Sequence, residues 1–114
     1  MEKQKEVNIS IGTRSTLLFA EGQRGYAVGR KWLILVHSVK SGDNDLYLLK
    51  SHVSYCLTTG STNTNLLAPG FWGFSDYYIF YEPTEEHKQM MLDILKKNNL
   101  KFISVLNKLI RVKT

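Results

Sequence analysis

Two of the three histidines, His37 and His52, lie in neighbouring apolar segments, and Lys50 precedes the second of them by two residues. Two imidazoles and a lysine can carry out acid–base cleavage of RNA when they share one face. An RNase-like enzyme is therefore one hypothesis for this chain, with His37, Lys50 and His52 as candidate catalytic residues. Single histidines in strands are more often structural, so the sequence favours a non-enzymatic protein.

Whether these side chains meet depends on the register of one hairpin. Five consecutive apolar residues at 32–36 predict a central strand, and the alternating segment 46–57 predicts its antiparallel partner. If Gly42 pairs with Asp45, both imidazoles share a face, roughly 7–8 Å apart. A slip of one residue puts them on opposite faces. The alternation also predicts one common apolar face, made by Tyr47, Leu49, Val53, Tyr55 and Leu57.

The patterns on either side of this hairpin predict an α+β domain, with a mainly antiparallel sheet of five or six strands and one principal helix. Strands are expected at 6–11 and 77–81, while 16–20 fits a strand or one helical turn. The helix is expected at 84–98, with Thr84 as its N-cap and its apolar face on the sheet. That face comprises His87, Met90, Met91, Ile94 and Leu95.

Basic residues are concentrated at the C-terminal end. The chain of 114 residues has a net charge of +5. Residues 88–114 carry seven basic side chains and one acidic, a net +6, whereas residues 1–87 carry eight basic and nine acidic, a net −1. A basic patch attracts phosphate-rich partners by releasing counterions. The favoured hypothesis is therefore a small binding protein that holds nucleic acid, DNA or RNA, through Lys96, Lys97, Lys101, Phe102, Arg111 and Lys113.

The segment 100–113 is expected to form a hairpin with Asn107 and Lys108 at its turn, although its apolar spacing also fits a second helix. One face of this hairpin is expected to be buried and consists of Ile103, Val105, Ile110 and Val112. The other face consists of Phe102, Ser104, Arg111 and Lys113. Single-strand binders combine stacking rings with cations, so this second face is expected to hold the nucleic acid.

The aromatic stretch PGFWGFSDYYIFYEP, residues 69–83, offers a different surface. Its second half is expected to be a core strand. Its first half is expected to be a loop, because glycines flank the rings and the polar stretch 59–69, expected to be mobile, precedes it. Exposed aromatic residues mark interfaces. The alternative hypothesis is therefore a protein–protein interaction module, or a homo-oligomer, that uses Phe71, Trp72 and Phe74.

The same stretch, followed by the helix, resembles part of an RNA-recognition motif. The resemblance rests on a Gly-aromatic-Gly-aromatic pattern made by Gly70, Phe71, Gly73 and Phe74. It implies rings that stack on RNA bases. The chain departs from the family pattern at the additional Trp72, at the negative Asp76 and in 12–45, where no helix is expected. Membership of that family is therefore not predicted.

Composition narrows the class of protein further. The length fits a single domain over 1–114, and the hydrophobic content of 43% is enough for one core. The single cysteine, Cys56, allows no intramolecular disulfide and favours a reducing compartment, so a cytoplasmic location is expected. No apolar run approaches the roughly 20 residues of a membrane helix, so no membrane partner is expected. No spacing indicates a metal or a cofactor, and none is expected. The size and the lysine content suit a viral accessory protein.

Overall fold

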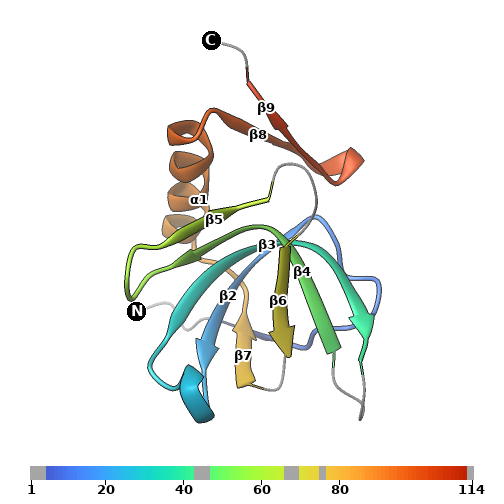
Figure 1. The fold of residues 1–114 in the computed structure, drawn as a ribbon, viewed down its shortest axis with the longest axis vertical. Helices are drawn as coiled ribbons and strands as arrows, with labels where there is room; N and C mark the ends of the chain where they lie inside the picture. Colours follow the sequence, from blue (N-terminus) through green and yellow to red (C-terminus); the bar gives the residue numbers. More distant parts are fainter. Residues whose placement is uncertain (1–4, 43–46, 66–69, 75–76, 113–114) are drawn as a thin grey trace.

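The structure, a computed structural model, describes residues 5–42, 47–65, 70–74 and 77–112, with the backbone alone for 70–74 (Figure 1). The main strands are β1 (Glu6–Val7), β2 (Thr16–Gly22), β3 (Lys31–Ser41), β4 (Tyr47–Cys56), β5 (Thr62–Thr64), β6 (Gly70–Phe74) and β7 (Tyr78–Tyr81). They are followed by the helix α1 (Glu85–Lys97) and by the strands β8 (Leu100–Ile103) and β9 (Lys108–Arg111). Short 3₁₀ turns lie at Gly25–Ala27 and at Ser104–Leu106.

The strands form one large antiparallel sheet and one small one. Six strands follow the order β1-β7-β2-β3-β4-β5, and β6 pairs with β4 beside β5. The strands β8 and β9 make the separate two-stranded sheet. In Figure 1, α1 and this hairpin lie together at one end of the molecule, next to the curved main sheet. The α+β architecture with one principal helix is therefore confirmed.

Two apolar clusters cover the two faces of the main sheet. The inner cluster comprises Leu18, Ala20, Ala27, Ile34, Val36, Val39, Leu49, Tyr78 and Phe80. The helix-side cluster comprises Phe19, Leu33, Leu35, Val53, Met91, Leu95, Leu100 and Leu109. Val7 of β1 and Tyr47 of β4 both pack against the inner cluster, although their strands are far apart in the strand order. The sheet must therefore curl around the inner cluster.

A double bulge in the ladder of β3 and β4 lets β4 contribute to both clusters. Leu35 pairs with Val53, then Val36 with Ser51, then Ser38 with Lys50. His52 is thus the extra residue of the first bulge, and His37 is the extra residue of the second. An extra residue reverses the alternation of faces. The expectation of one common apolar face on β4 is wrong for this reason: Tyr47 and Leu49 join the inner cluster, while Val53, Tyr55 and Leu57 join the helix-side cluster.

The helix forms where the sequence predicts it, between Thr84 and Asn98. The Thr84 hydroxyl accepts from the backbone N–H of His87, and Nδ1 of His87 accepts from the backbone N–H of Thr84. This reciprocal capping satisfies two donors that the first turn would otherwise leave free. The expected apolar face is confirmed, since Met91 and Leu95 are buried and His87 is half-buried. Met90 and Ile94 are half-buried at its edges.

The C-terminal hairpin is confirmed, but its register is not the predicted one. Phe102 pairs with Leu109 and Ile103 with Lys108, because the turn Ser104–Leu106 and a left-handed Asn107 replace a tight turn. Val105 and Val112 are 84% and 41% exposed, so their predicted burial is wrong. Phe102 shares its face with the buried Leu109 and points inward, which corrects its predicted place on an open cationic face.

Two further segments differ from expectation. The strand predicted at 6–11 is limited to β1. The segment Gly70–Phe74 is a strand paired with β4 and not a loop. Within the polar stretch 59–69, Thr62–Thr64 form β5. The mobility of that stretch stays a prediction, and its residues 66–69 lie outside the described residues.

Candidate functional site

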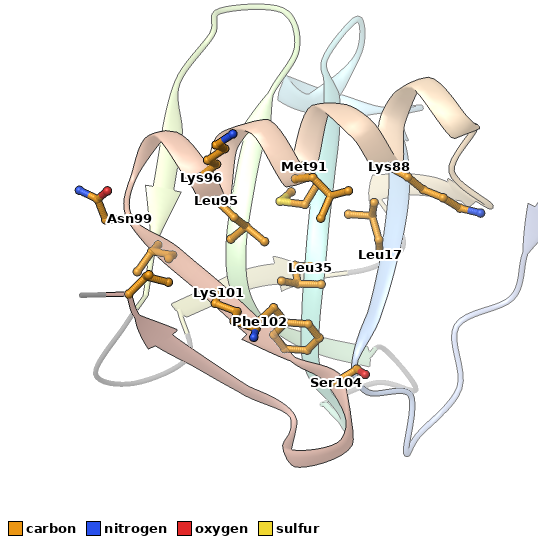
Figure 2. A pocket seen from close by; sticks show the side chains of 13 residues that line it. Leu17, Leu35, Lys88, Met91, Leu95, Lys96, Asn99, Lys101, Phe102 and Ser104 are labelled. Atoms are coloured by element: carbon orange, nitrogen blue, oxygen red, sulfur yellow. The ribbon is translucent and has the colours of Figure 1, made fainter. Parts of the chain in front are cut away.

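An apolar groove with a volume of about 870 Å³ lies between α1 and the C-terminal hairpin. Its floor is formed by Leu17 and Leu35 of the main sheet, and its helix wall by Met91, Leu92 and Leu95. Figure 2 shows Met91 and Leu95 reaching from the helix toward the floor. The hairpin wall is formed by Leu100, Phe102 and Val112. Ligand sites of this size are usually concave and mostly apolar.

The groove exists because the chain reverses sharply at the end of α1. Asn98 caps the helix, Asn99 takes a left-handed conformation with φ 57°, and β8 begins at Leu100. Asparagine is among the few residues that adopt this conformation readily. The backbone N–H of Val112 donates to the carbonyl oxygen of Asn99 at 2.8 Å and ties the end of the hairpin to the same corner. The helix and the hairpin therefore diverge from one corner and leave the groove between them.

The far end of the hairpin is attached to the double bulge by Asn107. Its Nδ2 donates to the carbonyl oxygen of His37 at 2.8 Å, so its Oδ1 accepts from Nε2–H of His52 at 2.9 Å. The ring of Phe102 lies 5.0 Å from that of His52, between centroids. The hydroxyl of Ser15 adds a hydrogen bond to the carbonyl oxygen of Ser104 at 2.9 Å. The hairpin wall of the groove is thus fixed at both of its ends.

Three lysines, Lys88, Lys96 and Lys101, are among the residues that line the groove, and none of the thirteen lining residues that the structure describes is acidic. In Figure 2, Lys88 and Lys96 project away from the apolar floor. Lys88 also pairs with Glu85 at 3.0 Å, on an exposed surface where such a pair contributes little. Because Leu92 is 59% exposed, the helix wall still presents apolar surface to solvent.

The two candidate catalytic histidines do come together, but by a route the sequence does not predict. Their ring centroids are 5.0 Å apart in an edge-on arrangement. The register differs by one residue from the pairing that favoured their meeting, and the bulges bring the rings to one side. His52 is only 4% exposed and is held by Asn107, so it serves the attachment of the hairpin. Of the two, His37 lines an open hollow.

The electrostatic surroundings of His37 are cationic. Burial lowers its pKa below the ordinary 6.5, and His52, Lys50, Arg14 and Lys40 lower it further. Lys50, the third candidate catalytic residue, is therefore near His37, opposite Ser38 in the ladder. Nδ1 of His37 and the hydroxyl of Ser38 are hydrogen-bonded at 2.9 Å. Protonated imidazole is disfavoured here in the absence of an anion.

The residues of the predicted nucleic-acid surface are divided by the structure. Lys96 and Lys101 lie at the groove, whereas Lys97 lines a separate hollow with Asp93. Arg111 is exposed at the end of β9. Phe102 is half-buried in the groove wall, and Lys113 lies outside the described residues. The prediction that the ring of Phe102 lies on an open face of the hairpin is therefore wrong.

The predicted protein interface lies on β6. In the ladder between β6 and β4, Phe71 pairs with Lys50 and Phe74 pairs with Leu48. Trp72 is not among the paired residues of this ladder. The side chains of Phe71, Trp72 and Phe74 are outside what the structure describes, so their role in an interface stays a prediction. The second half of the aromatic stretch is core, as expected, because Tyr78 and Phe80 are buried.

No helix among the described residues is long and apolar enough to cross a membrane. Within the same residues, no group of three or more histidine, cysteine, aspartate and glutamate side chains is arranged to hold a metal ion. No protein-family model, curated protein or solved structure matches the chain. Its function is therefore inferred from the geometry of the groove and of the histidine pair.

The sequence predicts only some of the residues that form this site. The amphipathic period of the helix identified Met91 and Leu95, but it assigned them to the core alone. Leu92 lies outside that period and is exposed in the structure, so the helix has apolar surface that the period does not predict. The sequence indicates Asn107 only as a turn residue, because its partners, His37 and His52, are 70 and 55 residues away.

Proposed function

We propose that this protein is a small non-enzymatic binding protein whose groove takes an acidic, amphipathic segment of a partner protein. The observation that carries the proposal is the apolar groove beside α1, bordered by Lys88, Lys96 and Lys101. Amphipathic helices and peptides are commonly bound by apolar grooves between secondary-structure elements. A cationic rim selects segments with carboxylates beside their apolar residues.

The spacing of the lysines supports a polypeptide over a ligand with one charged head. Lys88 and Lys96 are eight residues apart on α1, which corresponds to about 12 Å along the helix axis. Lys101 adds a third cation from β8. A peptide segment with several carboxylates along its length can pair with all three lysines. The single carboxylate of a fatty acid can pair with only one of them at a time.

Nucleic acid is the competing occupant, and its case rests on charge. Lys96, Lys97, Lys101 and Arg111 remain exposed and would attract phosphates. A phosphate backbone offers no apolar groups that could pack against the floor of the groove. Phe102 faces that floor. Nucleic-acid binding is therefore kept as an outcome of the experiment below.

The experiment is a fluorescence-anisotropy titration with a labelled synthetic helix of leucine and glutamate, about as long as the 13-residue α1. A lysine-for-glutamate version of the peptide, a short single-stranded oligonucleotide and a fluorescent fatty acid are titrated in parallel. Lys96→Glu is compared with Lys97→Glu, a matched control because the neighbouring lysine shares the last helical turn but lines a different hollow.

The expected result is binding of the acidic peptide, weakened about tenfold, or about 1.4 kcal/mol, by Lys96→Glu and by Leu92→Glu. Lys97→Glu should change the affinity less than threefold. Equal losses in the two lysine variants would reduce the interaction to diffuse charge and refute the proposal. Binding of the oligonucleotide or of the fatty acid, with none of the peptide, would assign the groove to that ligand instead.

A further inference from the structure

A second hollow, of about 410 Å³, lies on the other side of the hairpin turn. It is formed by three segments that are distant in the sequence: the approach to β2, the second bulge of β3 and the turn before β9. The polar side chains that line it are Thr13, Arg14, His37, Ser38 and Asn107. The described part of the chain places no carboxylate in this lining.

Hydrogen-bond donors are available in this hollow in every state of His37. If Nδ1 accepts from the hydroxyl of Ser38, the proton of the imidazole is on Nε2 and can be donated elsewhere. If Nδ1–H donates to Ser38, the hydroxyl proton of Ser38 is left to donate instead. Arg14 adds a planar guanidinium with several donors, which suits the oxygens of a phosphate.

The titratable groups that act on His37 are all bases, so any charge that they carry is positive. They are His52 and Lys50 of β4, Lys40 of β3 and Arg14 of the segment before β2. An anion in the hollow would interact favourably with each of them and with a protonated His37. The hollow is larger than a phosphate, so it also has room for the group to which a phosphate is esterified.

We propose that the hollow formed by Arg14, His37, Ser38 and Asn107 binds the phosphate group of a small phosphorylated ligand. The site is separate from the groove and does not depend on the proposed function. It uses His37 as a ligand-binding residue, while His52 remains buried behind it. This assigns a role to the histidine pair without requiring catalysis.

The experiment measures the pKa of each histidine by NMR, with and without phosphate, at constant ionic strength set by chloride. A concentration of about 20 mM saturates a site whose Kd is near 1 mM. Inorganic phosphate and phenyl phosphate are compared, because the free anion and an ester share the chemistry that the site recognises. His87 is an internal reference, since it lies at the start of α1 and stacks on Phe19 at 4.7 Å between ring centroids.

The pKa of His37 should rise by about 0.5, which corresponds to a roughly threefold preference of the anion for the protonated imidazole. The pKa of His87 should not change. Arg14→Gln should abolish the rise, whereas Arg24→Gln, which removes an arginine stacked on Tyr77, should leave it intact. A larger rise with phenyl phosphate than with inorganic phosphate would identify an ester as the ligand, and the reverse would identify the free anion. An unchanged His37, an equal change at His87, or a rise that persists in Arg14→Gln would overturn the proposal.

Discussion

Replacing Asn107 tests the attachment of the hairpin most directly. Asn107→Gly removes the side chain but keeps the left-handed backbone, φ 49°, that glycine adopts freely. The change leaves Nε2–H of the buried His52 and the carbonyl oxygen of His37 without this partner. An unsatisfied buried donor costs about 1–3 kcal/mol, so the free energy of unfolding should fall by about that amount.

Asn107→Ala adds a second cost. A side chain other than asparagine in the left-handed region costs roughly 1–2 kcal/mol, so this variant should lose about 2–5 kcal/mol in total. The difference between the two variants therefore separates the backbone cost from the loss of the hydrogen bonds.

The assay is urea unfolding followed by circular dichroism, with Asn99→Gly as the matched control. Asn99 has a similar backbone conformation, φ 57°, but among the described residues its side chain makes no such bridge. The control should change the unfolding free energy by less than about 0.5 kcal/mol. If Asn107→Gly is as mild as Asn99→Gly, the hydrogen bonds of Asn107 do not hold the hairpin and the reasoning fails.

Three further predictions concern the helix and the histidines. Leu95→Ala should destabilise by about 2–4 kcal/mol and the half-buried Ile94→Ala by less, in urea unfolding; the opposite order would mean that the helix face is misassigned. Thr84→Ala should lower the unfolding free energy by about 1 kcal/mol by removing the N-cap, whereas no loss would show that the cap is dispensable. Burial lowers the pKa of both His37 and His87 below 6.5, so the folded state binds protons more weakly than the unfolded state. Stability should therefore fall as the pH drops through 6.5 toward the folded pKa, and His37→Gln with His87→Gln should flatten that dependence; an unchanged slope in thermal melts would contradict it.

Local patterns in the sequence were sufficient for the helix and for most of the strands. Thr84 marks the start of the helix, the 3.6-residue period marks its apolar face, and Asn98 and Asn99 mark its end. Each of these signals lies close in the sequence to the residues that it affects. The long hairpin of β3 and β4 was also predictable, because two apolar segments flank a cluster of turn-forming residues. The fold class followed from these elements.

The bulges and the site were not predictable in the same way. A bulge is set by how a strand fits both of its neighbours, and a period-2 pattern contains no mark of an extra residue. Its effect is large here, because it puts Leu49 and Val53 on opposite faces of the sheet. The register of the C-terminal hairpin is not predictable for a related reason: the local sequence at Asn107 favours a tight turn, whereas its contacts with the distant His37 and His52 favour a wider one.

The double bulge also has a consequence for how the molecule melts. Across the bulge, β4 changes from the inner cluster, at Leu49, to the helix-side cluster, at Val53. Its partner β3 contributes to both clusters by alternation, with Ile34 in the inner cluster and Leu35 in the helix-side cluster. The same backbone ladder therefore supports both cores, and neither can come apart without releasing strands that the other requires. Such shared strands join two layers into one cooperative unit. The helix, the hairpin and the curled sheet are therefore expected to unfold in a single transition, without an intermediate that keeps one core and loses the other.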